Sequence, residues 1–265
     1  MPGTRFRDVR WFDAIDSTNT YLLAEARQGA PEGVVAVADR QWAGKGRLGR
    51  RWTAPSGANL LVSVLLRPHL PDDQRHLASV VVALAAADAA QSVAGVTAGL
   101  KWPNDLLAPS GRKLAGVLAE ADLAAPEVAA ADLQPLVPAI VVGLGLNVAW
   151  PGPSDVLPPD LVDRVTSLDF ERGSPTDRAA VLDALLDALE PRVAALGTPG
   201  GRRDQAAAFR ARCVTVGTMV RVELPGEQFV GRAVDVTDAG HLVVDVGDRT
   251  RSVVAGDVVH VRPPA

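Results

Sequence analysis

Cysteine is almost absent from the 265-residue sequence, which contains only Cys213. A single cysteine cannot form an intramolecular disulfide or a cysteine-based zinc site, and such usage is compatible with a reducing cytoplasm. The four histidines are scattered without the spacing that metal ligands show, so we expect none of them to bind a metal.

Long apolar runs and an excess of positive charge are also missing. The amino terminus has no apolar segment of the kind that signal peptides carry. The longest apolar helical stretch, Leu77 to Ala90, is interrupted by Asp88 and is too short to span a bilayer. A formal net charge of −4 argues against a protein that mainly grips nucleic acid through phosphates. The sequence therefore predicts a cytoplasmic protein with no membrane and no nucleic acid as partners.

Hydrophobic residues make up 48% of the chain, which is ample for a large core. Their periodicity, with caps and breakers, predicts four helices, from Ser17 to Gly29 and over 75–94, 176–196 and 203–212. Strands are expected over 34–38 and 58–68, around Leu100, and over 114–121 and 139–148. Two segments rich in proline with alanine or aspartate, 122–138 and 150–165, are expected to be loops.

After Cys213 the texture of the sequence changes. Short valine-rich segments alternate with turn signals such as Pro225-Gly226 and Ala239-Gly240. About fifty residues of this kind predict a small antiparallel barrel. We therefore expect two domains, 1–212 and 213–265.

Gly44, Gly46 and Gly49 satisfy a GxGxxG pattern, but the pattern alone is weak evidence for a dinucleotide site. It lies several residues beyond the expected strand, and the following segment is a poor helix start. We therefore do not expect a Rossmann-type site.

The same segment concentrates positive charge, and its cations are spaced by glycines. Such a loop can fold over a polyanion with backbone N–H groups and guanidinium donors together. The alternative is a solvated basic loop, which is the commoner fate of a charge run. Flanking tryptophans, one of which could pack on a purine, favour the ligand-binding alternative. The cations are Lys45, Arg47, Arg50 and Arg51, and the tryptophans are Trp42 and Trp52.

Two further segments display polar groups at the ends of expected strands. Lys101 precedes Trp102-Pro103, which ends a strand, and Lys113 precedes a small-residue pair that permits close approach of a ligand. Two lysines facing one pocket would be costly unless an anion holds them, although singly each is more often a surface group. The glycines of 143–147 indicate either a tight bend or close ligand approach, and Asn147 suits an adenine edge.

Taken in this order, the segments resemble those of the biotin protein ligases. The likeness is strong over residues 12–150 and weaker towards the terminal barrel. The matching segments are Ser-Thr-Asn at 17–19, QWAGKGRLGR at 41–50 with Trp52, GANLLVS at 57–63, KWPND at 101–105, KLAG at 113–116 with Glu120, and GLGLN at 143–147.

The resemblance implies an α+β fold. Its catalytic domain would be a mixed β-sheet with packed helices, of the class II synthetase-like type shared with lipoate ligases, followed by a Src-homology-3-like barrel. It also implies an ATP-dependent enzyme that converts biotin to biotinyl-5'-adenylate and transfers biotin to a lysine. The acceptor would be the biotin carboxyl carrier domain of a biotin-dependent carboxylase, and the cofactors would be ATP, biotin and Mg²⁺.

The resemblance also implies roles for individual residues. Hydrogen bonds to the ureido head of biotin would come from Ser17, Thr18, Asn19 and Gln41. The loop that orders over biotin would contain Lys45, Gly46 and Arg47, while Arg50 and Trp52 would serve the nucleotide side.

At the reacting end, the implied catalytic residues are Arg47, Lys101 and Lys113. Lys101 would bridge the biotin carboxylate and the α-phosphate, and Lys113 would hold the carboxylate. Asn147 would face adenine, while Gly116 and Gly145 would leave room for biotin and the nucleotide. The chain departs from the family pattern at Lys45, where arginine is usual, so a bidentate contact is lost there.

Three alternatives are considered, one of them another enzyme and two from other classes of protein. Lipoate ligases and octanoyltransferases share the implied fold, but the transferases use a cysteine nucleophile and Cys213 lies outside every motif. A DNA-binding repressor would need a helix-turn-helix domain before residue 17. A module that only binds biotin would not need two motif lysines and a nucleotide loop.

Overall fold

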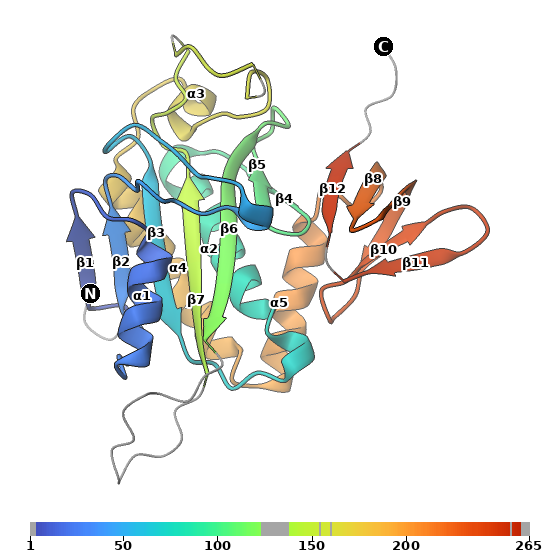
Figure 1. Cartoon of the computed structure of the whole chain (residues 1–265), viewed down its shortest axis with the longest axis horizontal. Helices are drawn as coiled ribbons and strands as arrows, with labels where there is room; N and C mark the ends of the chain where they lie inside the picture. Colours follow the sequence, from blue (N-terminus) through green and yellow to red (C-terminus); the bar gives the residue numbers. More distant parts are fainter. Residues whose placement is uncertain (1–3, 123–137, 154, 160, 255, 261–265) are drawn as a thin grey trace.

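The computed structural model describes residues 4–122, 138–153, 155–159, 161–254 and 256–260, and the loop expected over 122–138 lies, apart from its two ends, outside them. A large mixed sheet has the order β1-β2-β3-β7-β6-β5-β4 (Figure 1). Its first pair is parallel and its other pairs are antiparallel. The strands are β1 (Val9–Phe12), β2 (Val35–Ala38), β3 (Leu60–Leu66), β4 (Gly99–Lys101), β5 (Asp105–Leu107), β6 (Lys113–Asp122) and β7 (Ala139–Leu146).

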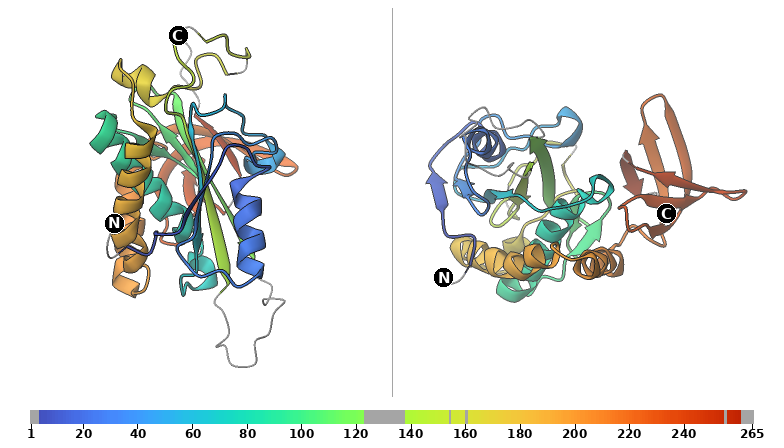
Figure 2. Two further views of the ribbon diagram at one scale, coloured as in Figure 1. Left: turned by 90° about the vertical axis from the view of Figure 1, so that its left-hand side faces the viewer. Right: turned by 90° about the horizontal axis from the view of Figure 1, so that it is seen from below.

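Helices cover both faces of this sheet (Figure 2). One face carries α1 (Thr18–Arg27), and the other carries α2 (Leu77–Ala94), α4 (Arg178–Ala195) and α5 (Pro199–Arg212). All seven residues of β3 are buried because both of its faces are covered. The segment Asp72–Ala94 is long and apolar enough to cross a membrane, but 72% of its apolar 18-residue stretch is buried, as expected of a core helix.

The predicted elements are present, with differences at their ends. The helix expected over 203–212 begins earlier, at Pro199, because the Thr198 hydroxyl accepts a hydrogen bond from the Gly201 N–H at 3.0 Å. The single strand expected near Leu100 is instead a hairpin of β4 and β5. Strand β1 and the short helix α3 (Leu168–Arg172) were not predicted from the sequence.

The carboxy-terminal sheet confirms the expected small antiparallel domain. Its order is β11-β10-β9-β8-β12, and alternate side chains such as Val220, Val222 and Val244 fill its interior. The domain boundary after residue 212 stays a prediction, although α5 ends there. The strands are β8 (Met219–Leu224), β9 (Glu227–Val236), β10 (Leu242–Asp245), β11 (Thr250–Val253) and β12 (Asp257–His260).

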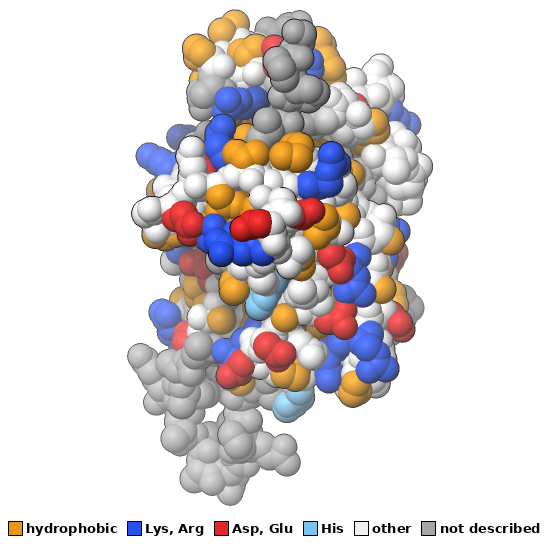
Figure 3. Space-filling model, turned by 90° about the vertical axis from the view of Figure 1, so that its right-hand side faces the viewer, with side chains coloured by type: hydrophobic (Ala, Val, Ile, Leu, Met, Phe, Trp, Pro, Cys, Tyr) orange, Lys and Arg blue, Asp and Glu red, His pale blue; other side chains and the backbone are white. Residues whose placement is uncertain are grey.

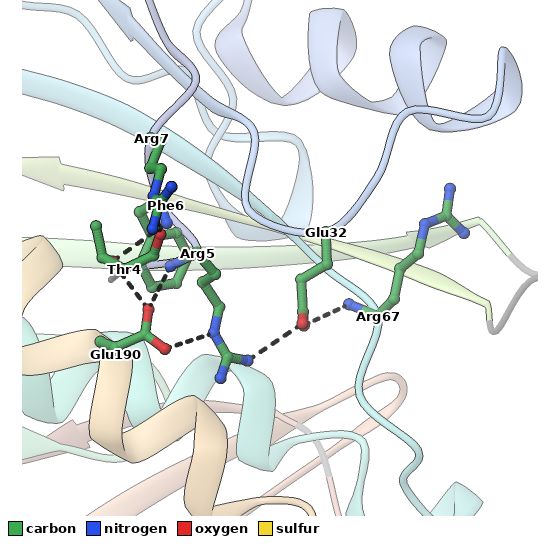
Figure 4. Close-up of polar contacts among 7 residues, drawn as sticks. All are labelled: Thr4, Arg5, Phe6, Arg7, Glu32, Arg67 and Glu190. Carbon is green, nitrogen blue, oxygen red and sulfur yellow. Dashed lines mark hydrogen bonds and ion pairs between the residues drawn. The ribbon is translucent and has the colours of Figure 1, made fainter. Parts of the chain in front are cut away.

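A polar network ties the amino-terminal segment to the body of the larger domain (Figure 4). The Glu190 carboxylate on α4 accepts from the Thr4 hydroxyl at 2.9 Å and from the Arg5 backbone at 2.8 Å. Arg5 also pairs with Glu32 at 3.1 Å, and Glu32 accepts from the Arg67 backbone at 3.1 Å. These bonds hold the chain before β1 against α4 and the segments that flank β2 and β3.

The small sheet is fixed against the large one through Trp102, which is only 3% exposed. The Trp102 backbone donates to the Thr215 hydroxyl at 3.0 Å, and its indole N–H donates to the Gly240 carbonyl at 2.8 Å. These two bonds place the barrel beside β4, the strand that ends at Lys101. On the side of the molecule where the barrel lies, Figure 3 shows Lys and Arg side chains interspersed with Asp and Glu.

Candidate active site

Glycines hollow out the face of the large sheet that carries α1. On this face, Gly143 lies between Ser63 and Leu118 on the neighbouring strands, and Gly145 lies between Leu61 and Gly116. Gly145 and Gly116 are direct neighbours without side chains, and Gly143 lies two residues further along β7, so a trough crosses β7 and β6. An open cavity occupies this region, and residues of both expected domains line it.

One end of the trough carries neutral polar groups. Ser17 caps α1 by accepting from the Thr20 N–H at 3.5 Å, which leaves its hydroxyl proton for another partner. Thr18 donates its backbone N–H to Gln41 Oε1 at 2.7 Å, and its hydroxyl lies 3.1 Å from the same oxygen. Because its carbonyl oxygen is used in this way, Gln41 presents its Nε2 donors to the cavity.

Asn19 is buried at 4% exposure, and both ends of its amide are engaged. Nδ2 donates to Glu120 Oε2 at 2.8 Å and lies 3.2 Å from the Leu118 carbonyl, while Oδ1 accepts from the Ser63 hydroxyl at 2.6 Å. A Cβ at Gly143 would lie 2.4 Å from Asn19 Oδ1, so glycine is required there by this side chain. The expected contact between Asn19 and a ligand stays a prediction, because its amide is already part of the frame.

The other end of the trough is cationic. Lys101 ends β4, and burial lowers the pKa of its ammonium group, while Asp105 opposes this shift. Lys113 Nζ pairs with Asp105 Oδ1 at 2.6 Å, and Asp105 itself lies beside Gly116 on the neighbouring strand. Three strand spacings separate Ser63 on β3 from Asp105 on β5, which is about 14 Å. The cavity thus suits a ligand with a neutral polar head and an anionic tail.

The glycine-rich segment forms a small hairpin over the trough. Gly46 N donates to the Arg50 carbonyl at 2.7 Å, and Trp52 N donates to the Gly44 carbonyl at 3.0 Å. At the tip, Leu48 has a left-handed backbone with φ of 57° and is 70% exposed. The segment from Gly44 to Trp52, called the basic loop below, is therefore a closed hairpin rather than a helix start, as expected.

The basic loop reaches both domains. Arg47 donates to Asn104 Oδ1 and to the Gly256 carbonyl, each at 3.3 Å, and burial lowers the pKa of its guanidinium. Arg50 forms an ion pair with Asp257 of β12. Lys45 pairs instead with Glu120 of β6 at 3.1 Å. Two arginines thus fasten the loop towards the barrel, and one lysine fastens it to the large sheet.

The Trp52 side chain occupies the space above Gly116 and Gly145, where a ligand was expected. Its indole carbons would come within 2.8 Å of a Cβ at Gly145 and 3.3 Å of one at Gly116. Lys113 Nζ lies 5.5 Å from its ring centroid, and the buried indole Nε1 has no hydrogen-bond partner within the described residues. A ligand must therefore pack against this ring or displace it.

Asn147 is brought to the cavity, but its amide does not point freely into it. Nδ2 donates to the Thr166 carbonyl at 2.9 Å, and Oδ1 accepts from Asn59 at 3.1 Å. Asn59 in turn accepts from the backbone N–H groups of Val148 and Trp150 at 3.0 and 3.1 Å. The expected role of Asn147 towards adenine stays a prediction, and in this structure the residue pins the end of β7.

Sequence reasoning missed several residues of the site, of which Asn104 lines the cavity and Ser63 and Glu120 support residues that do. Ser63, Asn104 and Glu120 lie inside the segments that it identified, but their side chains received no role. The sequence did not predict which barrel residues line the cavity, because the alternation of a strand does not show which of its faces packs against another domain. The barrel contributes Arg221, Glu223, Asp257, Val258, Val259 and His260 to the cavity wall.

Comparison with known proteins places this geometry in a family. Residues 11–127 match the model of the biotin/lipoate A/B protein ligase family, and residues 215–261 match that of the biotin protein ligase C terminal domain. The biotin–[acetyl-CoA-carboxylase] ligase of Mycobacterium tuberculosis is 41% identical over 266 residues, which cover 98% of this chain and 91% of that protein. The chain belongs to the biotin protein ligase family.

Other members of the family agree with this assignment. The biotin–[acetyl-CoA-carboxylase] ligase of Paracoccus denitrificans is 35% identical over 187 residues, covering 70% of this biotin protein ligase and 72% of that one. The solved structure of biotin protein ligase from Aquifex aeolicus in complex with biotin and ATP has a TM-score of 0.77 at 24% identity. The match covers 97% of this chain and 100% of the Aquifex aeolicus chain. The likeness confirms the expected fold, and the relatives favour biotin over the lipoate alternative.

Proposed function

We propose that the trough and its basic loop are the site at which this biotin protein ligase joins biotin to ATP and then passes biotin to a protein lysine. The observation that carries the proposal is the polarity of the trough, which is neutral at the Ser17 end and cationic at the Lys101 end. Biotin has the same polarity, with an uncharged ureido ring at one end and a carboxylate at the other.

At the neutral end, the free hydrogen-bonding groups match a ureido ring. The Gln41 amide N–H groups and the Ser17 hydroxyl proton can donate to the ureido oxygen, since their other atoms are engaged. Thr18 Oγ1 is held 2.6 Å from Ser63 Oγ and keeps a lone pair that can accept from a ureido N–H. Asn19 holds this arrangement from below, and Gly46 of the basic loop lines the same cavity.

At the cationic end, a biotin carboxylate oxygen attacks the α-phosphorus of ATP, an O–P bond forms, and pyrophosphate leaves. Two anions approach each other in this step, so positive groups must already be in place. Lys101, Lys113 and Arg47 line that end of the cavity, and an anion between the lysines would raise the lowered pKa of Lys101. Arg50 and Trp52 then contact the nucleotide. Gly145 has no side chain and so leaves space for the Trp52 indole or for the nucleotide.

In the second step, the neutral amine of the acceptor lysine attacks the biotin carbonyl carbon, AMP leaves, and the amine loses a proton as the amide forms. Asp105 orients Lys113 through their 2.6 Å ion pair. The basic loop excludes water, which would otherwise hydrolyse the acyl adenylate.

Mg²⁺ enters this scheme as part of the ATP substrate. Among the described residues, no group of three or more His, Cys, Asp or Glu side chains could hold a metal ion. Asp105 and Asp257 face the cavity, but each is already paired with a cation. The side chains therefore do not form a magnesium site of their own, and we assign them no step through the metal.

The acceptor that we propose is the biotin carboxyl carrier domain of a biotin-dependent carboxylase, and the proposed location is the cytoplasm. The name of the 41% identical relative, which specifies acetyl-CoA carboxylase, supports this choice. We also propose that residues 1–212 and 213–265 are separate domains, supported by the end of α5 at Arg212.

The test is a reaction of the purified protein with ATP, Mg²⁺ and either biotin or lipoate, analysed by mass spectrometry. Biotinyl adenylate is expected from biotin, and none from reactions without ATP. Addition of a carrier domain should then consume the adenylate and add biotin to one lysine. Acyl adenylate formed from lipoate but not from biotin would overturn the proposed function.

A further inference from the structure

Glu120 lies on β6, outside the reacting groups, with both oxygens of its carboxylate in use. Oε1 pairs with Lys45 Nζ at 3.1 Å, and Oε2 accepts from Asn19 Nδ2 at 2.8 Å. Residues 116, 118 and 120 of a strand point to the same side, so Glu120 borders the trough that Gly116 opens. The carboxylate thus joins the basic loop above the trough to α1 beside it.

The contacts of Glu120 continue into the neutral polar end. Asn19 Oδ1 accepts from the Ser63 hydroxyl at 2.6 Å, and Ser63 Oγ lies 2.6 Å from Thr18 Oγ1. Thr18 then bonds Gln41 Oε1 at 2.7 Å through its backbone N–H. The chain of contacts starts at Lys45, crosses β6, α1 and β3, and returns to Gln41, which lies four residues before Lys45.

The cations of the basic loop divide between two anchors. Arg47 and Arg50 contact the barrel at Gly256 and Asp257, towards the nucleotide side. Among the loop cations, Lys45 is the one that pairs with Glu120 on the large sheet. Its ion pair is 44% and 28% exposed at the two side chains, so it is weak enough to open and reform as ligand enters and leaves.

We infer that Glu120 is a positioning residue that closes the basic loop over the biotin head and at the same time fixes the groups that bind the head. This inference rests on the proposed function of the trough. Neither Lys101 nor Lys113 belongs to the chain of contacts, so Glu120 acts on biotin binding and not on the reaction between carboxylate and α-phosphate. Arginine is usual at position 45 in the family. The Lys45 ammonium group found here pairs with one carboxylate oxygen, Glu120 Oε1.

The test compares Glu120→Gln with Lys45→Gln, the double variant and Lys45→Arg. Glu120→Gln keeps an oxygen that accepts from Asn19 but removes the charge that holds Lys45. Biotin binding is measured by calorimetry, and adenylate formation by single turnover at saturating biotin and ATP. A matched control is Glu227→Gln, which breaks a comparable ion pair with Arg251 on the barrel at 2.6 Å, away from the trough.

Each single variant should raise the dissociation constant of biotin up to about fivefold, the upper end expected for a partly exposed ion pair. The double variant should be no worse than either, because the same contact is lost, and Lys45→Arg should bind normally. The single-turnover rate at saturation should stay within about twofold of the wild type, and Glu227→Gln should change neither quantity.

Additive effects of the two substitutions, unchanged biotin binding, or an equal loss of rate at saturating biotin would overturn the inference. If Glu120→Gln lowers the melting temperature, Lys45→Gln decides the question alone, because that side chain is exposed and leaves the sheet intact. Failure of the wild type to make biotinyl adenylate would reject the proposed function. A competent wild type with unaffected variants would reject only the role of Glu120.

Discussion

Lys101 lies at the end of β4, where burial lowers the pKa of its ammonium group before any anion is present. If it stabilises charge between the carboxylate and the α-phosphate, Lys101→Ala should slow adenylate formation by about a hundredfold, or roughly 3 kcal/mol. Biotin affinity should fall much less, since the ureido ring is still held at the other end of the trough. Single-turnover kinetics beside calorimetry measures the two effects.

A surface role for Lys101 predicts a different result for the same variant. Removal of a lysine at an exposed strand end changes stability by under about 0.5 kcal/mol and leaves the rate nearly unchanged. Near-normal turnover would therefore reject the catalytic role. A melting curve for the variant shows whether a slow enzyme is also a folded one.

Gly143 is a glycine of the trough whose replacement would disturb a group on the binding side. A Cβ there would lie 2.4 Å from Asn19 Oδ1 and 3.1 Å from its Cγ, and the Asn19 amide is buried and bonded at both ends. Gly143→Ala should lower the free energy of unfolding by about 1–3 kcal/mol and weaken biotin binding. Gly200→Ala is the control, since nothing lies within 4 Å of a Cβ on that helical residue, and it should be neutral or stabilising. Equal urea midpoints for the two variants would contradict the assigned contact.

At the scale of elements, the basic loop is held by contacts that are individually weak. Arg50 and Lys45 are 62% and 44% exposed in their ion pairs, and such pairs contribute about 1 kcal/mol or less. We expect trypsin to cut free protein rapidly at Arg47, Arg50 or Arg51 and to cut it slowly once biotin and ATP are bound. Peptide mapping over time measures this, with the exposed Arg203 of α5 as an internal reference. Equal protection of the loop in both states would be the contrary outcome.

The elements that the sequence predicts correctly are those with local signals. Ser17 caps α1, the apolar run of 58–68 yields β3, and the turn pairs after residue 213 separate the barrel strands. The hairpin of β4 and β5 was missed because three-residue strands carry too short a pattern to detect. The lysines and glycines that line the cavity lie in recognisable segments, so the sequence could single them out, and their roles stay predictions.

The amide roles could not be predicted, because they depend on contacts between distant parts of the chain. Asn19 and Asn147 have the donors and acceptors that a ligand needs, yet Glu120, Ser63, Thr166 and Asn59 engage them first. The contact of the basic loop with the barrel joins residues 207 positions apart, at Arg50 and Asp257. Pattern alone does not give such pairings, which follow from how the two sheets pack.

At the scale of the whole molecule, the distribution of lysine follows the chemistry. The chain has 27 lysine and arginine residues, of which only Lys45, Lys101 and Lys113 are lysines, and all three line the cavity. An acyl adenylate reacts with neutral amines, whereas a guanidinium stays protonated at any working pH and does not attack it. Two of the three lysines also form ion pairs with carboxylates, Lys45 with Glu120 and Lys113 with Asp105.

The surface outside the cavity therefore offers the enzyme's own reactive intermediate no lysine to acylate. Wild-type protein incubated with biotin, ATP and Mg²⁺, but without carrier, should remain free of biotin on Lys45 and Lys113. Arg221→Lys places an amine on β8 at the cavity wall and should become biotinylated there, whereas Arg203→Lys on exposed α5, away from the cavity, should gain far less. Intact mass and peptide mapping measure the labelling and distinguish side chains from the terminal amine. Biotin on Lys45 or Lys113 of the wild type would show that ion pairing does not protect them. Equal labelling of the two variants would show that released adenylate acylates lysines wherever they lie, so that distance from the cavity does not matter.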